Sequence, residues 1–142
     1  MDTPERTGLL EAVAAIHDIW TRTNDLIGPA LAERRLTPAT FQALWAIDPD
    51  EPPPSMKTMA ERLHCNAPNL TFITNQLIER NLVERAVDPA DRRSRVLVLT
   101  EAGRSARAEL VGAVLEKTPL AALDADGLRR LVALLNRAAG AG

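Results

Sequence analysis

Apolar residues recur at helical spacing near both ends of the chain. The N-terminal positions are Leu9, Val13, Ile16, Trp20, Ile27 and Leu31. Recurrence at three, four or seven residues predicts an amphipathic helix over residues 5–35, which Pro29 should kink or interrupt. The C-terminal pattern predicts a helix from Thr100 to about Lys117, broken by Pro119, and a last helix over 124–139.

Three shorter helices are expected between these long ones. Thr37 is a good N-cap with Pro38 after it, so a helix should begin there. Residues 48–54 form a stiff loop with four prolines and two aspartates. Ser55 is a second N-cap for a short helix, and residues 64–66 form a turn. Asn66 or Ala67 then begins a helix that reaches Arg80.

A hairpin follows this last helix. Asn81 stands where a helix commonly ends in a left-handed residue. Two apolar runs, Leu82–Val87 and Arg95–Thr100, flank a polar turn. The residues of the turn that shape or charge it are Asp88, Pro89, Asp91, Arg92 and Arg93. Two helices joined by a tight turn and followed by a hairpin predict a mainly α winged helix-turn-helix fold with a two-stranded wing.

The length of 142 residues predicts a single domain spanning 1–142. We place the winged helix-turn-helix core at 37–100 and dimerisation helices at 5–35 and 101–139. The helices outside the core carry more apolar residues than one small core needs, which predicts a homodimer. These residues are Leu9, Leu10, Val13, Leu110, Val114, Leu115, Leu120, Leu123, Leu128 and Leu131.

The net charge of −2 is unevenly distributed along the chain. Residues 1–54 have a net charge of −5, residues 55–107 of +3, and residues 108–142 are neutral. A basic middle between acidic or neutral ends is typical of a local nucleic-acid footprint. An unevenly charged solvated surface would give the same totals, so the charge alone leaves both readings open.

The helix over 66–80 has two different faces when residues are placed 100° apart. Its inward face carries Leu70, Ile73, Thr74, Leu77 and Ile78. Its outward face carries Pro68, Asn69, Thr71, Phe72, Asn75, Gln76 and Glu79. Asn and Gln can bond adenine bidentately, and Phe or a Thr methyl group can contact the thymine methyl group, which favours an A·T-leaning target. An ordinary solvated helix face remains the alternative.

Several motifs together resemble the MarR family of bacterial transcriptional regulators over residues 9–138. They are Leu36-Thr37 with Phe41 and Leu44, Met59–Leu63, Asn69-Leu70-Thr71, Leu77–Arg85, Asp88–Arg93 and Leu99–Gly103. The resemblance implies a homodimer on a palindromic double-stranded DNA operator, with the helix over 66–80 in a major groove. It also implies that Arg93 enters the flanking minor groove and that Asp91 orients the wing through its basic neighbours. Repression is the commoner mode in similar proteins.

The chain departs from the family on the DNA-binding helix. Family members often carry Arg where this chain has Phe72 and Gln76, and residues 65–79 contain no Lys or Arg. Affinity for the DNA phosphate backbone must then come from basic residues outside this helix. They are Lys57, Arg62, Arg80, Arg85, Arg92, Arg93 and Arg95. Because phosphate contacts carry the salt dependence of binding, we expect weak or strongly salt-sensitive DNA binding.

The resemblance also implies a pocket for a small aromatic or phenolic effector that would release the repressor. The candidate lining residues are His17, Trp20, Phe41 and Trp45. Such an effector must bind the two states of the protein with different affinity. The alternative is that both tryptophans simply belong to the core.

Other classes of function receive little support. Cys65 is the single cysteine, which excludes an internal disulfide and suits a reducing cytoplasm. Two distant histidines make no zinc spacing, and no catalytic or cofactor motif is present, so we expect no metal, no cofactor and no enzyme activity. No apolar run reaches membrane-spanning length. A winged helix that binds proteins rather than DNA is the competing function, favoured by the acidic N-terminal third.

Overall fold

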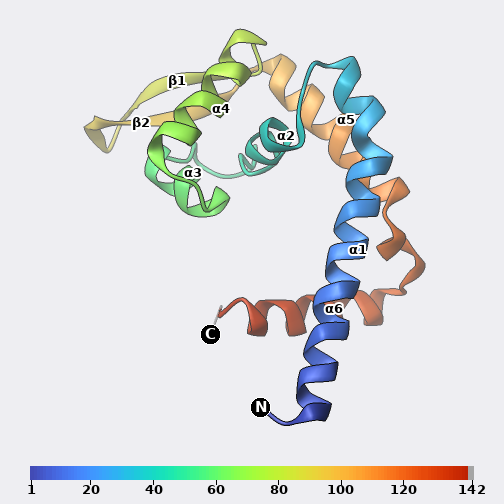
Figure 1. Ribbon diagram of the computed structural model, residues 1–142. Helices are drawn as coiled ribbons and strands as arrows, with labels where there is room; N and C mark the ends of the chain where they lie inside the picture. The colour runs from blue at the N-terminus through green and yellow to red at the C-terminus, as the bar shows by residue number, and fades with distance from the viewer. Residues whose placement is uncertain (141–142) are drawn as a thin grey trace. The chain divides into compact units, whose positions relative to one another are not determined.

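The computed structural model describes residues 1–140, and most of these residues are helical (Figure 1). The elements are α1 (Thr3–Glu33), α2 (Pro38–Trp45), α3 (Met56–Leu63), α4 (Ala67–Glu79), β1 (Val83–Asp88), β2 (Asp91–Leu99), α5 (Glu101–Lys117), the 3₁₀ helix η1 (Pro119–Ala122) and α6 (Ala125–Ala138). The predicted fold class, a mainly α winged helix-turn-helix with a two-stranded wing, is confirmed.

The chain divides into two compact units. The central unit is Gly28–Ala113, and the terminal unit consists of Met1–Ile27 together with Val114–Gly142. Both divisions fall inside a helix, one in α1 and one in α5. The central unit is therefore wider than the winged helix-turn-helix limits of 37–100 expected from the sequence, and those limits and the single domain stay a prediction.

The central unit has a continuous apolar core. Helix α4 contacts α2, α3 and β1, and the sheet closes one side. The most deeply buried of its large side chains are Leu44, Met59, Leu70, Leu77, Leu97 and Leu110. Leu110 was expected in a dimer contact, but it is 2% exposed in this core, so that expectation is wrong. The reason is that the first part of α5 belongs to the central unit.

The helix starts in the central unit follow the predicted caps. The Thr37 hydroxyl accepts from the Thr40 N–H at 3.2 Å, and the Thr37 N–H donates to the Thr40 hydroxyl at 2.8 Å. Ser55 and Asn66 accept in the same way at the starts of α3 and α4. Asn81 has φ 59°, as predicted for a left-handed helix end. These local bonds satisfy N–H groups that the helices cannot satisfy themselves.

The wing is an antiparallel pair that extends beyond its apolar runs. Val83 pairs with Leu99 and Val87 with Arg95, but Asp88 pairs with Asp91. Residues 92–94 thus have no partner on β1 and form a bulge. The strands were expected to stop at this polar segment, and polar residues continue them because the backbone pairing does not depend on apolar side chains.

The proline-rich loop is attached to the wing. The Leu97 N–H donates to the Pro54 carbonyl at 2.9 Å, and Ser55 forms an isolated bridge with Val96. The loop therefore covers one edge of β2. Covering an edge strand removes free backbone groups that would otherwise pair with another chain.

Helix α1 runs without a break through Pro29 and ends at Glu33. An interruption at Pro29 was one of two effects expected, and it is wrong. Proline has no N–H, so the carbonyl of Asp25 loses its usual helical donor at this point. The division between the two units falls beside it, between Ile27 and Gly28.

The terminal unit lacks a core of its own. Among its described residues, Ile27 is the one buried side chain. Its large apolar side chains are exposed and include Leu9, Leu10, Val13, Ile16, Trp20, Leu115, Leu128, Val132, Leu134 and Leu135. A bond of 3.5 Å between the hydroxyl groups of Thr23 and Thr118 joins its two segments. This apolar surface is the main feature that the fold of one chain leaves uncovered.

Candidate nucleic-acid interface

Helix α4 presents the two faces expected from its sequence. Leu70, Thr74 and Leu77 are buried, and Ile73 and Ile78 are half-buried. On the opposite face Asn69, Thr71, Phe72 and Asn75 are exposed, and Gln76 is half-buried. The Phe72 side chain is 65% exposed, so its aromatic ring is free to make contacts outside this chain. This face carries hydrogen-bonding and apolar groups and no positive charge.

One residue of this face is tied to the wing. The Arg85 guanidinium on β1 donates from Nη2 to Oδ1 of Asn75 at 2.9 Å. Both side chains are exposed, so the bond lies at the outer surface of the central unit. The sequence analysis treated Arg85 only as a source of positive charge. Its proximity to Asn75 depends on the packing of α4 against β1, which residue spacing does not show.

The wing tip is shaped by short-range hydrogen bonds. The carboxylate of Asp88 accepts from the Ala90 N–H, and that of Asp91 accepts from the Arg93 N–H at 3.0 Å. Asp91 therefore orients the backbone of Arg93, whereas an action through its basic neighbours was expected. The Arg95 guanidinium donates to the carbonyls of Arg92 and Ser94 across the bulge.

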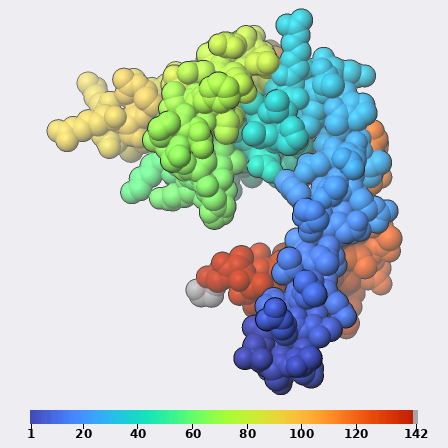
Figure 2. Space-filling view, in the orientation of Figure 1, coloured from blue at the N-terminus to red at the C-terminus, as the bar shows by residue number. Residues whose placement is uncertain are grey.

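Positive charge is concentrated at this tip. Arg92 and Arg93 lie in the bulge and are exposed, and Arg95 follows directly. In the space-filling view the hairpin projects beyond α4 within the central unit (Figure 2). A projecting hairpin with exposed guanidinium groups suits a narrow A·T-rich minor groove, where the potential is most negative.

Lys57 and Arg80, which were also predicted to contact DNA, differ in their exposure and in their hydrogen bonds. Lys57 is exposed on α3. Arg80, half-buried at the end of α4, donates to the carbonyl of Arg35 at 2.8 Å and to that of Gln76 at 3.0 Å. Arg80 thus links the end of α4 to the turn between α1 and α2. Its guanidinium has structural partners in addition to the DNA role predicted for it.

The base of the wing is closed by Thr100 and Gly103. The Thr100 hydroxyl donates to the Asn81 carbonyl at 2.7 Å and accepts from the Gly103 N–H at 2.9 Å. A Cβ atom on Gly103 would lie 1.9 Å from the Leu82 carbonyl oxygen, so only glycine fits. The wing is therefore fixed to the end of α4 and the start of α5. In the sequence this contact falls in Leu99–Gly103, one of the segments that carry the family resemblance.

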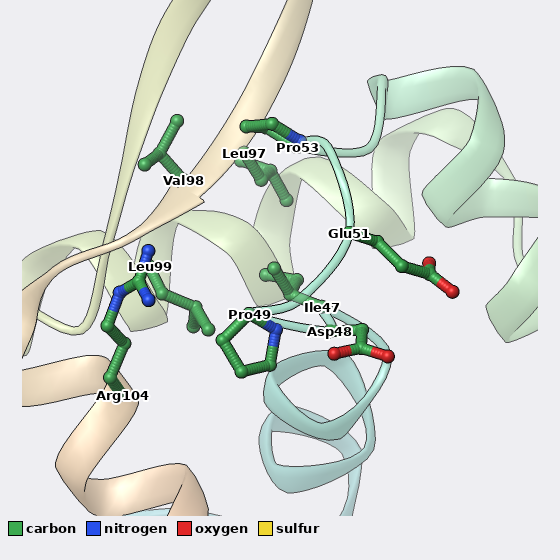
Figure 3. Close-up of a pocket in the computed structure, with 9 residues that line it drawn as sticks. All are labelled: Ile47, Asp48, Pro49, Glu51, Pro53, Leu97, Val98, Leu99 and Arg104. Atoms are coloured by element: carbon green, nitrogen blue, oxygen red, sulfur yellow. The ribbon is translucent and has the colours of Figure 1, made fainter.

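A small pocket beside the wing is too small for an organic ligand. Its volume is about 30 Å³, enough for one or two water molecules, whereas small-molecule sites usually exceed about 300 Å³. Figure 3 shows Arg104 from α5 at one side and the loop carboxylates of Asp48 and Glu51 at the other. Glu51 forms an ion pair with Arg62 at 3.5 Å. We assign this pocket no ligand.

The four residues predicted to bind an effector are divided between the two units. Phe41 and Trp45 lie in the central unit, with ring centroids 5.6 Å apart in an edge-to-face arrangement. His17 and Trp20 lie in the terminal unit. Trp20 is 49% and Trp45 39% exposed, so neither belongs to the buried core of this chain. A pocket made from all four stays a prediction.

Residues 1–140 contain no group of three or more His, Cys, Asp or Glu side chains placed to hold a metal ion. In the same range, no helix combines the length and hydropathy needed to cross a membrane.

A helix-turn-helix with an exposed polar face, next to a hairpin with an arginine-rich tip, is a winged helix-turn-helix, an arrangement typical of DNA-binding transcriptional regulators. Residues 36–94 match the model of the MarR family. Over this segment the chain is similar to the MarR family of transcriptional regulators. The family resemblance seen in the sequence is thereby confirmed.

Solved structures agree with this assignment. The transcriptional repressor CouR bound to a 23-mer DNA duplex is 27% identical, with a TM-score of 0.73 and 98% of each chain covered. Reduced MarR from E. coli is 25% identical, with a TM-score of 0.67, covering 88% of this chain and 93% of that one. BpsR from Bordetella bronchiseptica shares the fold at 20% identity and a TM-score of 0.69, covering 91% and 98%. No curated protein sequence matched the chain.

Proposed function

We propose that this chain is a homodimeric repressor that binds a palindromic double-stranded DNA operator. The observation that carries the proposal is the combination, within the central unit, of the exposed polar face of α4 and the projecting arginine-tipped wing. Helix α4 would enter a major groove, and Arg93 would enter the adjacent minor groove. CouR, 27% identical, is described as a repressor and was solved on a DNA duplex, which supports this reading.

The dimer follows from the uncovered apolar surface of the terminal unit. Helices with large exposed apolar faces usually bury them against a partner, and a two-fold partner is the commonest. Two-fold symmetry would place the two α4 helices about 34 Å apart, one turn of DNA. Light scattering that shows a stable monomer at micromolar concentration would contradict the dimer.

The location of positive charge, on the wing and not on α4, determines how strongly the protein binds DNA. Since α4 carries no positive charge, affinity for the DNA phosphate backbone depends on the wing and on Lys57. Each phosphate contact contributes about −0.9 to the slope of log affinity against log salt. We therefore expect weak or strongly salt-sensitive binding, and nanomolar affinity that salt does not change would contradict it.

A substitution at the wing tip tests the DNA-binding proposal. Wild-type protein is used to select operators from random duplex DNA, and its affinity is then measured across a salt series. Arg93→Ala should weaken binding about tenfold and reduce the salt slope by about 0.9. The matched control is Arg22→Ala, an exposed arginine of the terminal unit that pairs with Asp18. Selection of no duplex sequence would favour the competing function, a protein-binding winged helix.

The base preference of the operator follows from the α4 face as a whole. Asn69 and Gln76 can bond adenine, and Phe72 and Thr71 can contact thymine methyl groups, so the half-sites should lean towards A·T. Half-sites composed only of G·C pairs would contradict this.

We further propose that a small aromatic or phenolic effector releases the repressor. The support is that Trp20 and Trp45 are both partly exposed, so an aromatic ligand can reach their rings. For BpsR, which shares the fold, 6-hydroxynicotinic acid is described as regulating DNA binding. Salicylate-like compounds should quench tryptophan fluorescence and lower operator affinity, and Trp20→Phe or Trp45→Phe should reduce the quenching. A broad panel without any response would contradict the proposal.

A further inference from the structure

The bond between Arg85 and Asn75 fixes the orientation of an amide on the α4 face. A guanidinium group has only donors, so the Asn75 atom 2.9 Å from Arg85 Nη2 has to be the carbonyl oxygen. The amide nitrogen is then the other end of the planar group. Arg85 is positioned for this by β1, in which it pairs with Leu97, and by the contact of β1 with α4.

This orientation changes what Asn75 offers to a base. Bidentate binding of adenine needs the amide oxygen as acceptor for N6 and the amide nitrogen as donor to N7. In this chain the oxygen already accepts from a charged donor, and charge-assisted bonds are about twice as strong as neutral ones. The two N–H donors of the amide remain for the base.

The four bases differ in how well they meet two donors. Guanine presents two acceptors, N7 and O6, on its major-groove edge, whereas adenine presents one acceptor and one donor. Thymine presents a single acceptor, O4, and cytosine presents a donor. The bond from Arg85 uses one of the two lone pairs of the Asn75 oxygen and holds that oxygen towards β1. Guanine is therefore the base that suits an asparagine whose nitrogen is the end left for the base.

We propose that Arg85 is a positioning residue that makes Asn75 select guanine instead of adenine in the operator. The inference rests on the proposed function, because it requires α4 to enter the major groove. It assigns one G·C pair in each half-site to Asn75, within an operator that otherwise leans towards A·T. Arg85 acts through the amide and needs no base contact of its own.

The test measures base preference at single operator positions. An operator is selected with wild-type protein, and each position is then changed to all four bases. Affinities are measured for wild type, Asn75→Ala, Arg85→Ala and the double variant. The position that loses discrimination in Asn75→Ala is the one that Asn75 contacts. There, wild type should prefer guanine over adenine about tenfold, and Arg85→Ala should reverse or abolish this preference.

A control substitution of another hairpin arginine distinguishes the orientation of the Asn75 amide from a simple loss of positive charge. Arg92→Ala removes the same charge from the wing and should weaken binding to all four bases equally, leaving their order unchanged. In the double variant, Asn75→Ala and Arg85→Ala should not have additive effects on preference.

Three outcomes would overturn the inference. The first is an unchanged order of bases in Arg85→Ala, and the second is a wild-type preference for adenine at the Asn75 position. The third is an operator in which Asn75→Ala alters discrimination nowhere. All three occur with a selected operator in hand, so they differ from failure of the proposed function, in which wild type selects no sequence and both proposals fall.

Discussion

The central unit buries most of its large apolar side chains, whereas the terminal unit exposes them. Apart from Ile27, every buried hydrophobic side chain found in residues 1–140 belongs to the central unit. Most of the large exposed apolar side chains belong to the terminal unit. The central unit therefore buries its apolar core within one chain, while the terminal unit leaves the apolar surface uncovered that the proposed dimer would bury.

Polar contacts show the same contrast. In the central unit, Arg107 donates to the Trp45 carbonyl at 2.9 Å and Arg62 donates to the Ala46 carbonyl at 2.7 Å, so the end of α2 has charged donors. Arg34 and Glu109 form an ion pair in this unit as well. In the terminal unit, ion pairs such as that of Arg130 and Asp126 join neighbours on one helix. Such exposed pairs contribute little to stability.

The largest expected effect is at the base of the wing. Gly103→Ala should destabilise the protein by about 3 kcal/mol, because the new Cβ would lie 1.9 Å from the Leu82 carbonyl oxygen. Gly112→Ala, later in α5, meets no atom within 4 Å and should stabilise by up to about 1 kcal/mol. Urea unfolding followed by circular dichroism measures both. Equal effects of the two substitutions would show that the wing base is not close-packed.

The next effect tests whether the terminal unit needs a partner. Leu10→Glu combined with Val13→Glu should weaken the dimer about 100-fold or more, because each introduces an unpaired charge into an apolar contact. Sedimentation velocity measures the dissociation. Emission from Trp20 should change while that from Trp45 stays close to wild type, which variants retaining one tryptophan can show. Arg22→Glu is the charge control, and a dimer that survives the double change would place the interface elsewhere.

Helix caps test whether the two units unfold independently. Thr37→Ala removes the cap of α2 and should cost about 1 kcal/mol in the unfolding transition reported by Trp45 in a Trp20→Phe background. Asp124→Ala removes the equivalent cap of α6 and should leave that transition unchanged. If both substitutions shift the Trp45 transition equally, the two units unfold together.

The smallest effect is a gain in stability inside the central unit. Thr74 lies fully buried in α4, and within the described part of the chain its hydroxyl oxygen has no hydrogen-bond partner. Thr74→Val removes an unsatisfied hydroxyl and should stabilise by about 0.5 to 1 kcal/mol without changing operator preference. Thermal unfolding and the base-substitution series measure the two properties. A loss of stability would show that the hydroxyl has a partner, such as water.

The fold was largely predictable because its elements have local signals. Thr37, Ser55 and Asn66 are capping residues whose short side chains bond the next turn, so their identity is enough to place three helix starts. Asn81 likewise marks a left-handed helix end. The continuation of α1 through Pro29 was not predictable, since tertiary packing decides whether a helix tolerates the missing bond.

The candidate site was predictable in outline and not in its contacts. Helical periodicity separates the exposed face of α4 from Leu70 and Leu77. The link from Arg85 to Asn75 depends on the twist of β1 and its packing on α4, which no spacing of ten residues indicates. Arg80 shows the same limit, because its partner, the Arg35 carbonyl, lies 45 positions earlier in the chain.

The hairpin tip has a consequence for engineering. Its turn is closed by the carboxylates of Asp88 and Asp91 and by the bonds of Arg95 across the bulge, all of them within the segment 88–95. No core side chain takes part in these bonds. The segment can therefore be exchanged between related scaffolds, so that the minor-groove affinity proposed for it can be tuned while α4 stays unchanged.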